Sequence, residues 1–285
     1  MSIDTTKLTI RNSLIFALVM RRERLARMCV ERILGKKIRK ITYIESEKTE
    51  EISVETHGIR LDVYCENEEA VYNIEMQAYQ MDDLPKRSRY YQDMMDMILL
   101  KKGESYEVLK KNIVIFICTF DPFGLGRHIY TFENCCTQDT SLRLEDDSMK
   151  IFLNTTGTLD DIPAPLRKFL EYIESGVAED EYTRELDSVV SEVRTDEKWR
   201  KPIMTYEMMM NDMRNVGKRE GKEEGRAEGR AEGRAEGEAL GVAKEQKATV
   251  FRMLDAGMSE EHIMIATALD SESLHKVMEE YASAR

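Results

Sequence analysis

The sequence contains few of the residues from which disulfide frameworks and zinc sites are built. Its five cysteines are odd in number and include no Cys-x-x-Cys pair, and its four histidines lack the spacing of zinc ligands. In a chain of 285 residues this pattern is typical of a reducing compartment, where thiols stay free. Cys135 and Cys136 have no base placed beside them by the sequence, so we expect no thiol nucleophile. We therefore expect a cytoplasmic protein.

Long apolar segments are also missing. The longest apolar runs are Leu14 to Met20 and Ile113 to Cys118. Both are far shorter than the roughly 20 residues that a membrane helix needs. Arg21 and Arg22 follow the first run and no small-residue cleavage site is present, so the run is not a secretory signal. We expect no membrane partner.

Positive net charge is absent as well. Lys and Arg number 42 against 54 Asp and Glu, which gives a formal charge of −12 and excludes a uniformly basic nucleic-acid-binding surface. The charge is unevenly distributed, however. Basic residues outnumber acidic ones by 11 to 4 over 1–45 and by 7 to 4 over 84–111, whereas 45–83 has 2 basic and 12 acidic residues. These segments are either solvated faces or a carboxylate cluster that binds metal beside phosphate contacts.

Hydrophobic periodicity predicts an α/β domain over residues 1–155. Apolar residues recur at helical spacing over 12–34, and Gly35 is a suitable end for that helix. Alternating or apolar segments predict strands, and further helical patterns follow them. The predicted strands are 38–44, 52–56, 59–65, 71–77, 112–120, 128–133 and 150–154. The predicted helices after the first are 86–101, 163–175, 180–197 and 199–216.

The apolar, β-branched run 112–120 is typical of a strand that is covered on both faces. A strand, a helix and a buried strand in succession indicate a parallel crossover. We therefore expect a core of the order αβββαβ with a mixed sheet. Residues 156–216 are predicted to form a helical extension packed on this core, so the C-terminal region is all-α.

Residues 217–247 form a repeat in which glycine occurs at every fourth position from 217 to 241. Each glycine inside a helix costs about 1 kcal/mol relative to alanine, so a lone helix would be marginal. The same period aligns Arg226, Arg230 and Arg234 in one row and glutamates in another. Such rows repel within one helix but can pair between two helices. We favour a helical arm that makes the protein a homo-oligomer, in the manner of a coiled coil; a flexible linker is the alternative.

Residues 248–285 have the pattern of a small helical tail with two or three short helices. Gly257 is a suitable end for the first helix, Ser259 begins the next, and Asp270 or Ser271 begins a third. The segment is not basic, so packing is favoured over DNA reading.

Two carboxylates can meet on the predicted hairpin. If Asn67 to Ala70 form its loop, Glu66 pairs with Val71 and Asp62 lies opposite Glu75. Opposed side chains have Cβ atoms about 5 Å apart, where two carboxylates repel unless a cation lies between them. Mg²⁺ is commonly held by one or two carboxylates together with phosphate oxygens. Many hairpins carry such a pair without binding metal, so the spacing alone is weak evidence.

The segment IRLDVYCENEEAVYNIEMQ resembles the core of the Rpn family of recombination-promoting nucleases and transposases, a branch of the PD-(D/E)XK nucleases. The blocks LPKRSRYYQDMMDMILLKKGESY and IVIFICTFDPFGLGRHIYTFEN, the segment ERILGKKIRKI and the glycine repeat are also similar to the family, in the same order. The resemblance implies a restriction-endonuclease-like fold, a Mg²⁺ or Mn²⁺ cofactor and DNA as the partner.

The resemblance also implies roles for particular residues. Asp62 and Glu75 would bind the metal and act in catalysis, and Gln77 would occupy the position where the superfamily usually has lysine. Glutamine can hydrogen-bond a water but carries no charge, so the activity is expected to be weak. Glu31, on the first helix, is a candidate third carboxylate; the alternative is a solvated helix residue.

The helix after the Glu75 strand opens with cations that can contact DNA. Lys86, Arg87 and Arg89 can reach phosphates, and Tyr90 can stack on a base or sugar. The alternative is an exposed face with no ligand. The glycines at 124 and 126 are too sparse for a phosphate loop, so we expect no nucleotide cofactor.

Together these features predict a metal-dependent DNA endonuclease linked to recombination or transposition. It would hydrolyse a phosphodiester with a metal-activated water. The alternative is a DNA-binding or oligomerising protein of the nuclease fold that is catalytically weak or inactive.

Overall fold

The computed structural model describes residues 7–43 and 62–283 of the chain. The predicted strand 52–56 and the beginning of the predicted strand 59–65 lie outside these residues. The chain divides into two compact units, Met1–Met209 and Met210–Arg285, and the sheet belongs to the first. The family-like blocks of the sequence and the predicted carboxylate pair also lie in the first unit.

The described residues of the first unit form one mixed six-stranded sheet with the strand order β1-β2-β3-β4-β6-β5. The strands are β1 (Thr42–Tyr43), β2 (Val63–Glu66), β3 (Ala70–Gln77), β4 (Lys111–Cys118), β5 (Ile129–Phe132) and β6 (Ser148–Asn154). The pairs β3–β4 and β4–β6 are parallel, and the other three pairs are antiparallel. The predicted mixed α/β fold is therefore confirmed.

The two central strands are buried on both faces, which the apolar sequence predicted for β4 but not for β3. All residues of β3 and all but the first of β4 are buried. Helix α4 (Leu84–Leu99) connects them and the strands are parallel, so the predicted crossover is confirmed. Gln92 fixes this helix over the sheet because its amide donates to the carbonyl oxygens of Asn112 and Met149, each at 3.2 Å. The position of α4 sets the position of Arg87, described below.

The predicted single helix over 12–34 is wrong, because the chain forms α1 (Ser13–Met20) and α2 (Glu23–Leu34) instead. Arg22 is extended between them, with φ −80° and ψ 109°. Seven of the eight residues of α1 are buried, whereas α2 buries only one side. A break at two arginines lets each helix bury its own apolar surface. Gly35 ends α2 with a φ of 65°, as predicted.

The predicted strand over 38–44 begins later than expected, because among its described residues, 38–43, only Thr42 and Tyr43 pair with β2. The backbone N–H of Ile38 is already used, since it donates to the carboxylate of Glu31 at 2.9 Å. Ile38 and Ile41 are buried in the hydrophobic core although neither residue is part of a strand.

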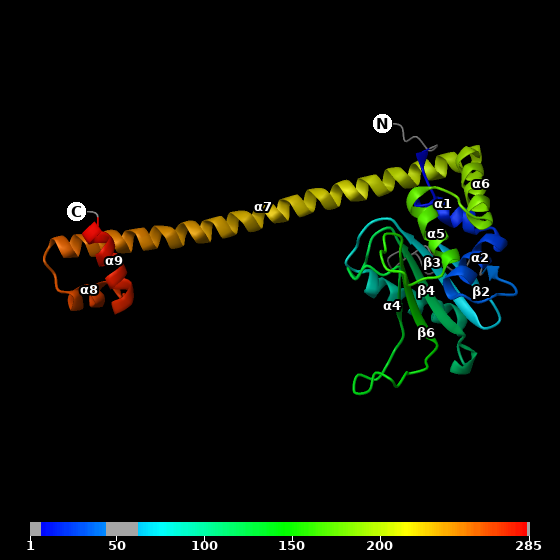
Figure 1. The fold of residues 1–285 in the computed structure, drawn as a ribbon, viewed down its shortest axis with the longest axis horizontal. Coiled ribbons are helices and arrows are strands. Elements are labelled where there is room, and N and C mark those ends of the chain that lie inside the picture. The colour runs from blue at the N-terminus through cyan, green and yellow to red at the C-terminus, as the bar shows by residue number, and fades with distance from the viewer. Residues whose placement is uncertain (1–6, 44–61, 284–285) are drawn as a thin grey trace. The chain divides into compact units, whose positions relative to one another are not determined.

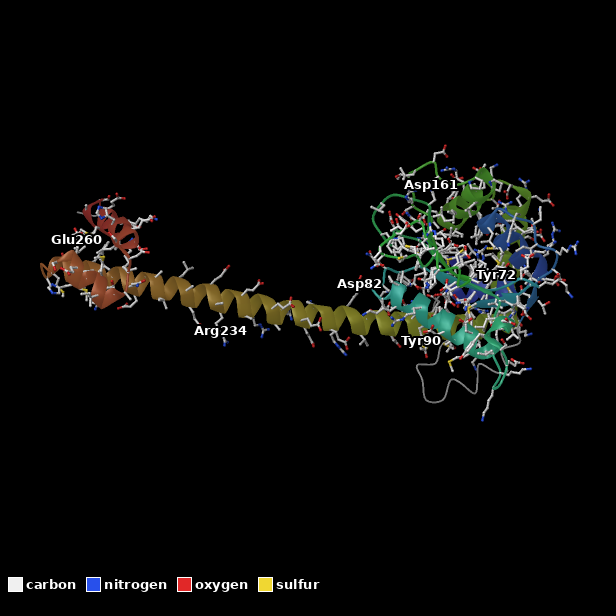
Figure 2. The ribbon with its side chains drawn as sticks, turned by 90° about the horizontal axis from the view of Figure 1, so that it is seen from below. Tyr72, Asp82, Tyr90, Asp161, Arg234 and Glu260 are labelled. Carbon is white, nitrogen blue, oxygen red and sulfur yellow. The ribbon has the colours of Figure 1, made fainter. Side chains whose placement is uncertain are left out.

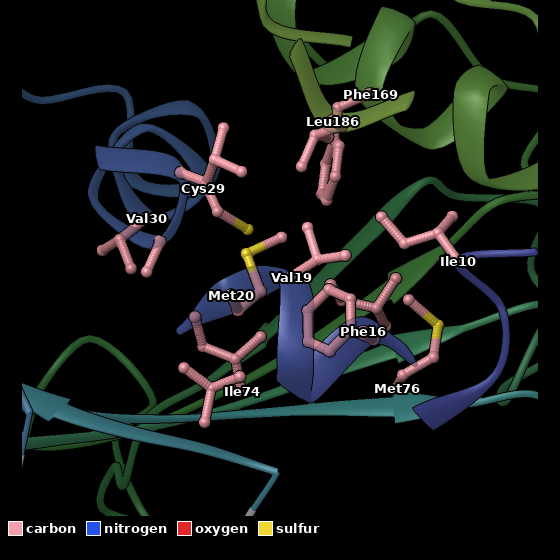
Figure 3. Close-up of a cluster of buried hydrophobic side chains, with 14 of the residues drawn as sticks. Ile10, Phe16, Val19, Met20, Cys29, Val30, Ile74, Met76, Phe169 and Leu186 are labelled. Carbon is pink, nitrogen blue, oxygen red and sulfur yellow. The ribbon is translucent and has the colours of Figure 1, made fainter. Parts of the chain in front are cut away.

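Helices α1, α2, α5 (Ala164–Ser175) and α6 (Glu181–Thr195) cover one face of the sheet, and α4 covers the other (Figure 1). The larger cluster joins Phe16, Val19 and Met20 of α1 to Ile74 and Met76 of β3 (Figure 3). Val71 of the same strand packs instead against α4. The alternation predicted for 71–77 is thus observed.

Helix α7 (Glu197–Asp255) continues through the whole glycine repeat, so the predicted helix end at 216 is wrong. The repeat residues are exposed, and the side chain of Arg234 extends into solvent (Figure 2). A Cβ atom added at any glycine of the repeat would meet nothing within 4 Å. Among the described residues, none packs against residues 217–241 of the repeat, so tertiary contacts do not end the helix there.

The second unit ends in a small helical cluster, as predicted. Gly257 takes a φ of 72° after α7, and α8 (Glu260–Thr267) and α9 (Ser271–Ser283) follow. Val250, Ile263 and Leu274, one from each helix, are fully or almost fully buried against one another. A packing role for the tail accounts for these contacts.

The five cysteines are free thiols. Cys29, Cys65 and Cys118 are buried, and burial raises the pKa of each to about 12. Cys135 is exposed and Cys136 is partly exposed. Over the described part of the chain, every helix is too short or too polar to cross a membrane.

Candidate active site

The hairpin of β2 and β3 brings Asp62 and Glu75 together. Its register pairs Glu66 with Val71 and Val63 with Ile74, so Asp62 lies opposite Glu75. The backbone N–H of Asp62 donates to Oε1 of Glu75 at 3.2 Å. In return the backbone N–H of Met76 donates to Oδ2 of Asp62, also at 3.2 Å. Each carboxylate is therefore held by the backbone of the opposite strand.

Glu75 is a buried carboxylate with a perturbed pKa. Its side chain points to the α4 face and the residue is 5% exposed. Burial raises its pKa, while the side chain of Asn73, the N–H of Asp62 and the charge of Arg87 act in the opposite direction. A buried carboxylate of this kind needs a compensating cation to stay ionised at neutral pH.

Asn73 lies two residues before Glu75 on the same face of β3, and it is completely buried. Neither its amide nitrogen nor its amide oxygen makes a hydrogen bond of good geometry with the described residues, although the amide lies close enough to Glu75 to lower the pKa of that carboxyl group. The hydroxyl of Tyr64, on the residue paired with Asn73 across the hairpin, is also buried without a partner. Orphaned buried polar groups usually mark a water, an ion or a ligand that completes the site.

Gln77, at the end of β3, is held by two contacts. Its amide nitrogen donates to the carbonyl oxygen of Tyr79 at 2.6 Å, and its amide oxygen accepts from Nη1 of Arg87 at 3.1 Å. Nη2 of Arg87 donates to the hydroxyl of Tyr91 at 2.9 Å. The guanidinium lies 5.6 Å from the ring centres of Tyr91 and Phe116. Arg87 is thus a fixed positive charge beside Gln77.

The other predicted DNA contacts lie on the outer side of α4. Lys86, Arg89 and Tyr90 are exposed, and Tyr90 is seen on this helix in Figure 2. Arg87 differs from them because it is partly buried and lies close enough to Glu75 for the charge of that carboxylate to raise its pKa. Arg87 is therefore partly buried, whereas Lys86 and Arg89 are exposed to solvent.

Glu31 occupies a different position from the carboxylate pair. Its carboxylate accepts from the N–H of Ile38 at 2.9 Å and pairs with Lys37 at 3.1 Å. Although burial acts to raise its pKa, these two partners and Arg27 lower it. The contacts of Glu31 within the described residues hold the segment after α2, and its role as a metal ligand stays a prediction.

Tyr206 lies close enough to the carboxylate pair to be affected by its charge, although no pattern in the local sequence indicates this. Tyr206, near the beginning of α7, hydrogen-bonds Ser13 at the beginning of α1. The pKa of Tyr206 is raised by burial first, and the negative charges of Asp62 and Glu75 add to the effect. Ser13 and Tyr206 are 193 residues apart, so no local pattern links them. Asn73, by contrast, could have been found from strand alternation.

The donor set fits a hard divalent cation that is only partly coordinated by protein. Within the described residues no group of three or more His, Cys, Asp or Glu side chains converges as a metal site. Two carboxylates do converge, and oxygen ligands of this kind suit Mg²⁺ or Mn²⁺ when phosphate and water supply the rest. The buried charge of Glu75 and the unpaired amide of Asn73 agree with a polar ligand at this position.

Comparison with known proteins connects this geometry to a family. Residues 27–155 match the family described as PD-(D/E)XK nuclease family transposase. No curated protein and no solved structure matches the chain. The matched segment contains β1 to β6 and α4, and therefore Asp62, Glu75, Gln77 and Arg87.

Proposed function

Since residues 27–155 match the family described as PD-(D/E)XK nuclease family transposase, we propose that the protein is a metal-dependent DNA endonuclease that acts in recombination or transposition. The observation that carries the proposal is a pair of hydrogen bonds: the backbone N–H of Asp62 donates to the Glu75 carboxylate, and the backbone N–H of Met76 donates to the Asp62 carboxylate. It fixes two carboxylates at the end of the hairpin, next to a cation on α4. The activity is assigned to the cytoplasm of a bacterium.

Asp62 and Glu75 are the proposed metal ligands, with Mg²⁺ or Mn²⁺ as the ion. When bound, such an ion lowers the pKa of a water molecule and stabilises the charge that develops on phosphorus. Asp62 is held by the N–H of Met76, and Glu75 by the N–H of Asp62, so neither carboxylate needs to reorganise. A fixed donor geometry of this kind reduces the cost of assembling the transition state.

In this proposal, Gln77 and Arg87 together replace the usual lysine: one orients the water and the other supplies the positive charge. Gln77 supplies an amide at the expected position, and Arg87 supplies the positive charge through a hydrogen bond to that amide. A guanidinium is always protonated, so it stabilises negative charge but does not donate a proton at neutral pH. The attacking water must therefore be oriented by Gln77 and lose its proton to solvent or to a phosphate oxygen.

The exposed side of α4 is the proposed surface for the DNA backbone. Lys86 and Arg89 would contact phosphates, and Tyr90 would stack on a base or sugar. These contacts position the strand and carry no sequence information. They would weaken uniformly as the salt concentration rises.

A second candidate function is a DNA-binding or oligomerising protein with little catalysis. One observation favours it: the nitrogen and the oxygen of the Gln77 amide are both already engaged, by Tyr79 and Arg87. Each atom keeps one further hydrogen-bonding position, but the two contacts fix the amide and restrict where a water can bind. The two candidates differ in metal dependence, because a binding protein keeps its affinity in chelator.

Plasmid cleavage by the full-length protein tests the proposal. We expect cutting with Mg²⁺ or Mn²⁺, none in chelator, and a loss of about 100-fold or more in Asp62→Ala and Glu75→Gln. Thermal unfolding gives a second readout that is independent of activity. Mg²⁺ should raise the Tm of the wild type and leave that of both variants unchanged, because a ligand that binds only the folded state stabilises it.

Glu68→Gln is a matched control, because Glu68 is exposed on the same hairpin. It should behave as the wild type in both assays. Absence of cleavage with either metal, combined with intact DNA binding, would leave the second candidate function.

A further inference from the structure

A cavity of about 270 Å³ lies on the α4 side of the sheet, between the start of α4 and the edge formed by β5 and β6. Three phenyl rings contribute to its wall: Phe123, Phe132 and Phe152. The ring of Phe152 is nearly perpendicular to the other two, with centroid distances of 5.2 Å to Phe123 and 5.7 Å to Phe132. Phe152 is only 2% exposed, so Phe132, which is 43% exposed, and the partly buried Phe123 offer most of the aromatic surface to a flat, apolar ligand.

Lys150 lines the same cavity and has an unusual environment. It is partly buried, and its ammonium group has no hydrogen bond or ion pair within the described residues. Burial lowers its pKa, and the charges of Asp146 and Asp93 only partly offset this effect. An ammonium group that is partly desolvated and unpaired favours an anionic ligand, such as a phosphate.

Two polar residues complete the wall. Glu133 and Asn134 are exposed and lie next to Phe132 in the sequence. The Asn134 amide nitrogen donates to Asp146 at 2.7 Å, which leaves its oxygen as an acceptor. Acceptors of this kind suit the exocyclic amino groups of adenine and cytosine. The wall thus combines aromatic faces, hydrogen-bond acceptors and one cation.

Packed aromatic rings connect the wall of the cavity to Arg87 of the candidate active site. Phe152 stacks on Phe116 at 5.5 Å, and the guanidinium of Arg87 lies 5.6 Å from the Phe116 ring. Pro85 and Ser88, in the first turns of α4, line the cavity, and Arg87 lies between them in sequence. A nucleic-acid strand at Arg87 therefore passes close to the cavity.

We propose that this cavity binds one unpaired nucleobase of the DNA substrate, with a neighbouring phosphate on Lys150. Aromatic side chains bind bases of any sequence by stacking, and lysine binds phosphate as a point charge. At about 30 Å³ for each water molecule in the liquid, the space holds a flat ring system and not only a single ordered water. The assignment of DNA as the source of the base rests on the proposed nuclease function.

Binding of labelled DNA to the full-length protein in chelator tests the inference without cleavage. The two probes are a paired duplex and the same duplex with one unpaired adenine. We expect the duplex with the unpaired adenine to bind about 10-fold more tightly, since base stacking on an aromatic residue contributes about 1–3 kcal/mol. Phe132→Ala and Lys150→Gln should each remove most of this difference.

Matched controls come from residues outside the cavity. Tyr106→Ala removes an aromatic side chain that is 79% exposed, and Lys102→Gln removes an exposed lysine. Both variants should keep the preference for the unpaired base. Circular dichroism checks folding, and Phe132 is itself 43% exposed, so its removal leaves the core intact.

Equal affinity for the two duplexes would overturn the inference, and so would a preference that survives both cavity variants. Tight binding of free dAMP without any preference for the unpaired duplex would also overturn it, in favour of a site for mononucleotides. Plasmid cleavage with Mg²⁺ separates the two proposals. A protein that cuts without the preference refutes only the cavity, whereas the preference without cutting refutes only the nuclease.

Discussion

At the scale of single residues, the contact between Gln77 and Arg87 places a positive charge beside the glutamine for which the resemblance implies the lysine position. The charge that glutamine lacks is present one hydrogen bond away, on a guanidinium packed over two aromatic rings. The pKa of Arg87 is raised further: burial acts to lower it, but Tyr91 and Glu75 outweigh that effect. The site therefore keeps a cation, with a different chemical character.

Replacement of Arg87 tests this account. Arg87→Ala should reduce the maximal cleavage rate by about 100-fold, because one preorganised electrostatic contact to the transition state is lost. Its Mg²⁺-dependent rise in Tm should remain, since Asp62 and Glu75 are unchanged. Adding Gln77→Lys to Arg87→Ala should restore part of the rate. Cleavage kinetics at saturating DNA measure these effects.

Arg89→Ala is the matched control two residues along the helix. It should weaken DNA binding and its salt dependence, and leave the rate at saturating DNA nearly unchanged. If Arg87→Ala behaved in the same way as Arg89→Ala, the assignment of Arg87 to the reaction would be wrong.

The sequence predicted the register of the hairpin that brings Asp62 and Glu75 together, because that register depends on local features. Strand alternation and a short loop placed Asp62 opposite Glu75, and the structure has that register. The contact between Ser13 and Tyr206 was not predictable, because these residues meet through the packing of α1 against α7. Periodicity reports which face a residue is on, but not which distant helix covers it.

At the scale of elements, the turn after β4 depends on a single carboxylate. Asp121 accepts hydrogen bonds from the hydroxyl of Tyr130 and the backbone N–H of Gly126, both at 2.7 Å. It also accepts from the N–H groups of Phe123 and Gly124. Burial acts to raise its pKa, but these four donors outweigh it and the pKa is lowered. The turn also positions Phe123, a wall of the cavity.

The lowered pKa predicts a pH-dependent contribution to stability. A carboxyl group with a depressed folded pKa stabilises the protein above its unfolded pKa, near 4, and loses this effect as the pH falls through the folded pKa. Asp121→Asn should therefore lower the free energy of unfolding at pH 7 by about 1 kcal/mol or more. The difference from wild type should shrink below about pH 4.

Urea unfolding at several pH values measures this difference. Asp82→Asn is the control, because Asp82 is exposed (Figure 2) and should give no change at any pH. A loss of stability in Asp121→Asn that is independent of pH would show that the negative charge of Asp121 does not stabilise the turn.

Element boundaries show what the sequence could and could not predict. Strand β4 was identifiable as covered on both faces because its apolar run is continuous, whereas β3 was identifiable only as an alternating strand because it carries Asn73, Glu75 and Gln77. The break at Arg22 was not identifiable, because the apolar residues on both sides fit one helical stripe. Tertiary packing decided that boundary, since one straight helix could not bury both halves.

At the scale of the whole molecule, α7 is the element that belongs to both units. Its glycine repeat is helical, which agrees with the arm that the sequence favoured, and self-association through it stays a prediction. The row of glycines would let a second helix approach closely, and the rows of Arg and Glu would then pair between chains.

Substitution of Gly225, Gly229 and Gly233 by alanine separates helix formation from association. Each change should stabilise the helix by about 1 kcal/mol, and the three methyl groups should weaken a close helix pair. We expect higher helicity with a smaller mass in analytical ultracentrifugation. Serine at Ala227, Ala231 and Ala235 is the control that preserves the glycine row. An unchanged mass in the glycine variant would favour the linker.

The distribution of the cysteines has a practical consequence. The three buried thiols stay protonated and shielded at neutral pH, whereas Cys135 and Cys136 are accessible. Asn134, which lines the aromatic cavity, directly precedes them. A solvent-sensitive fluorophore can therefore be attached beside the cavity in the native sequence. Its emission would report, in real time, when a ligand enters.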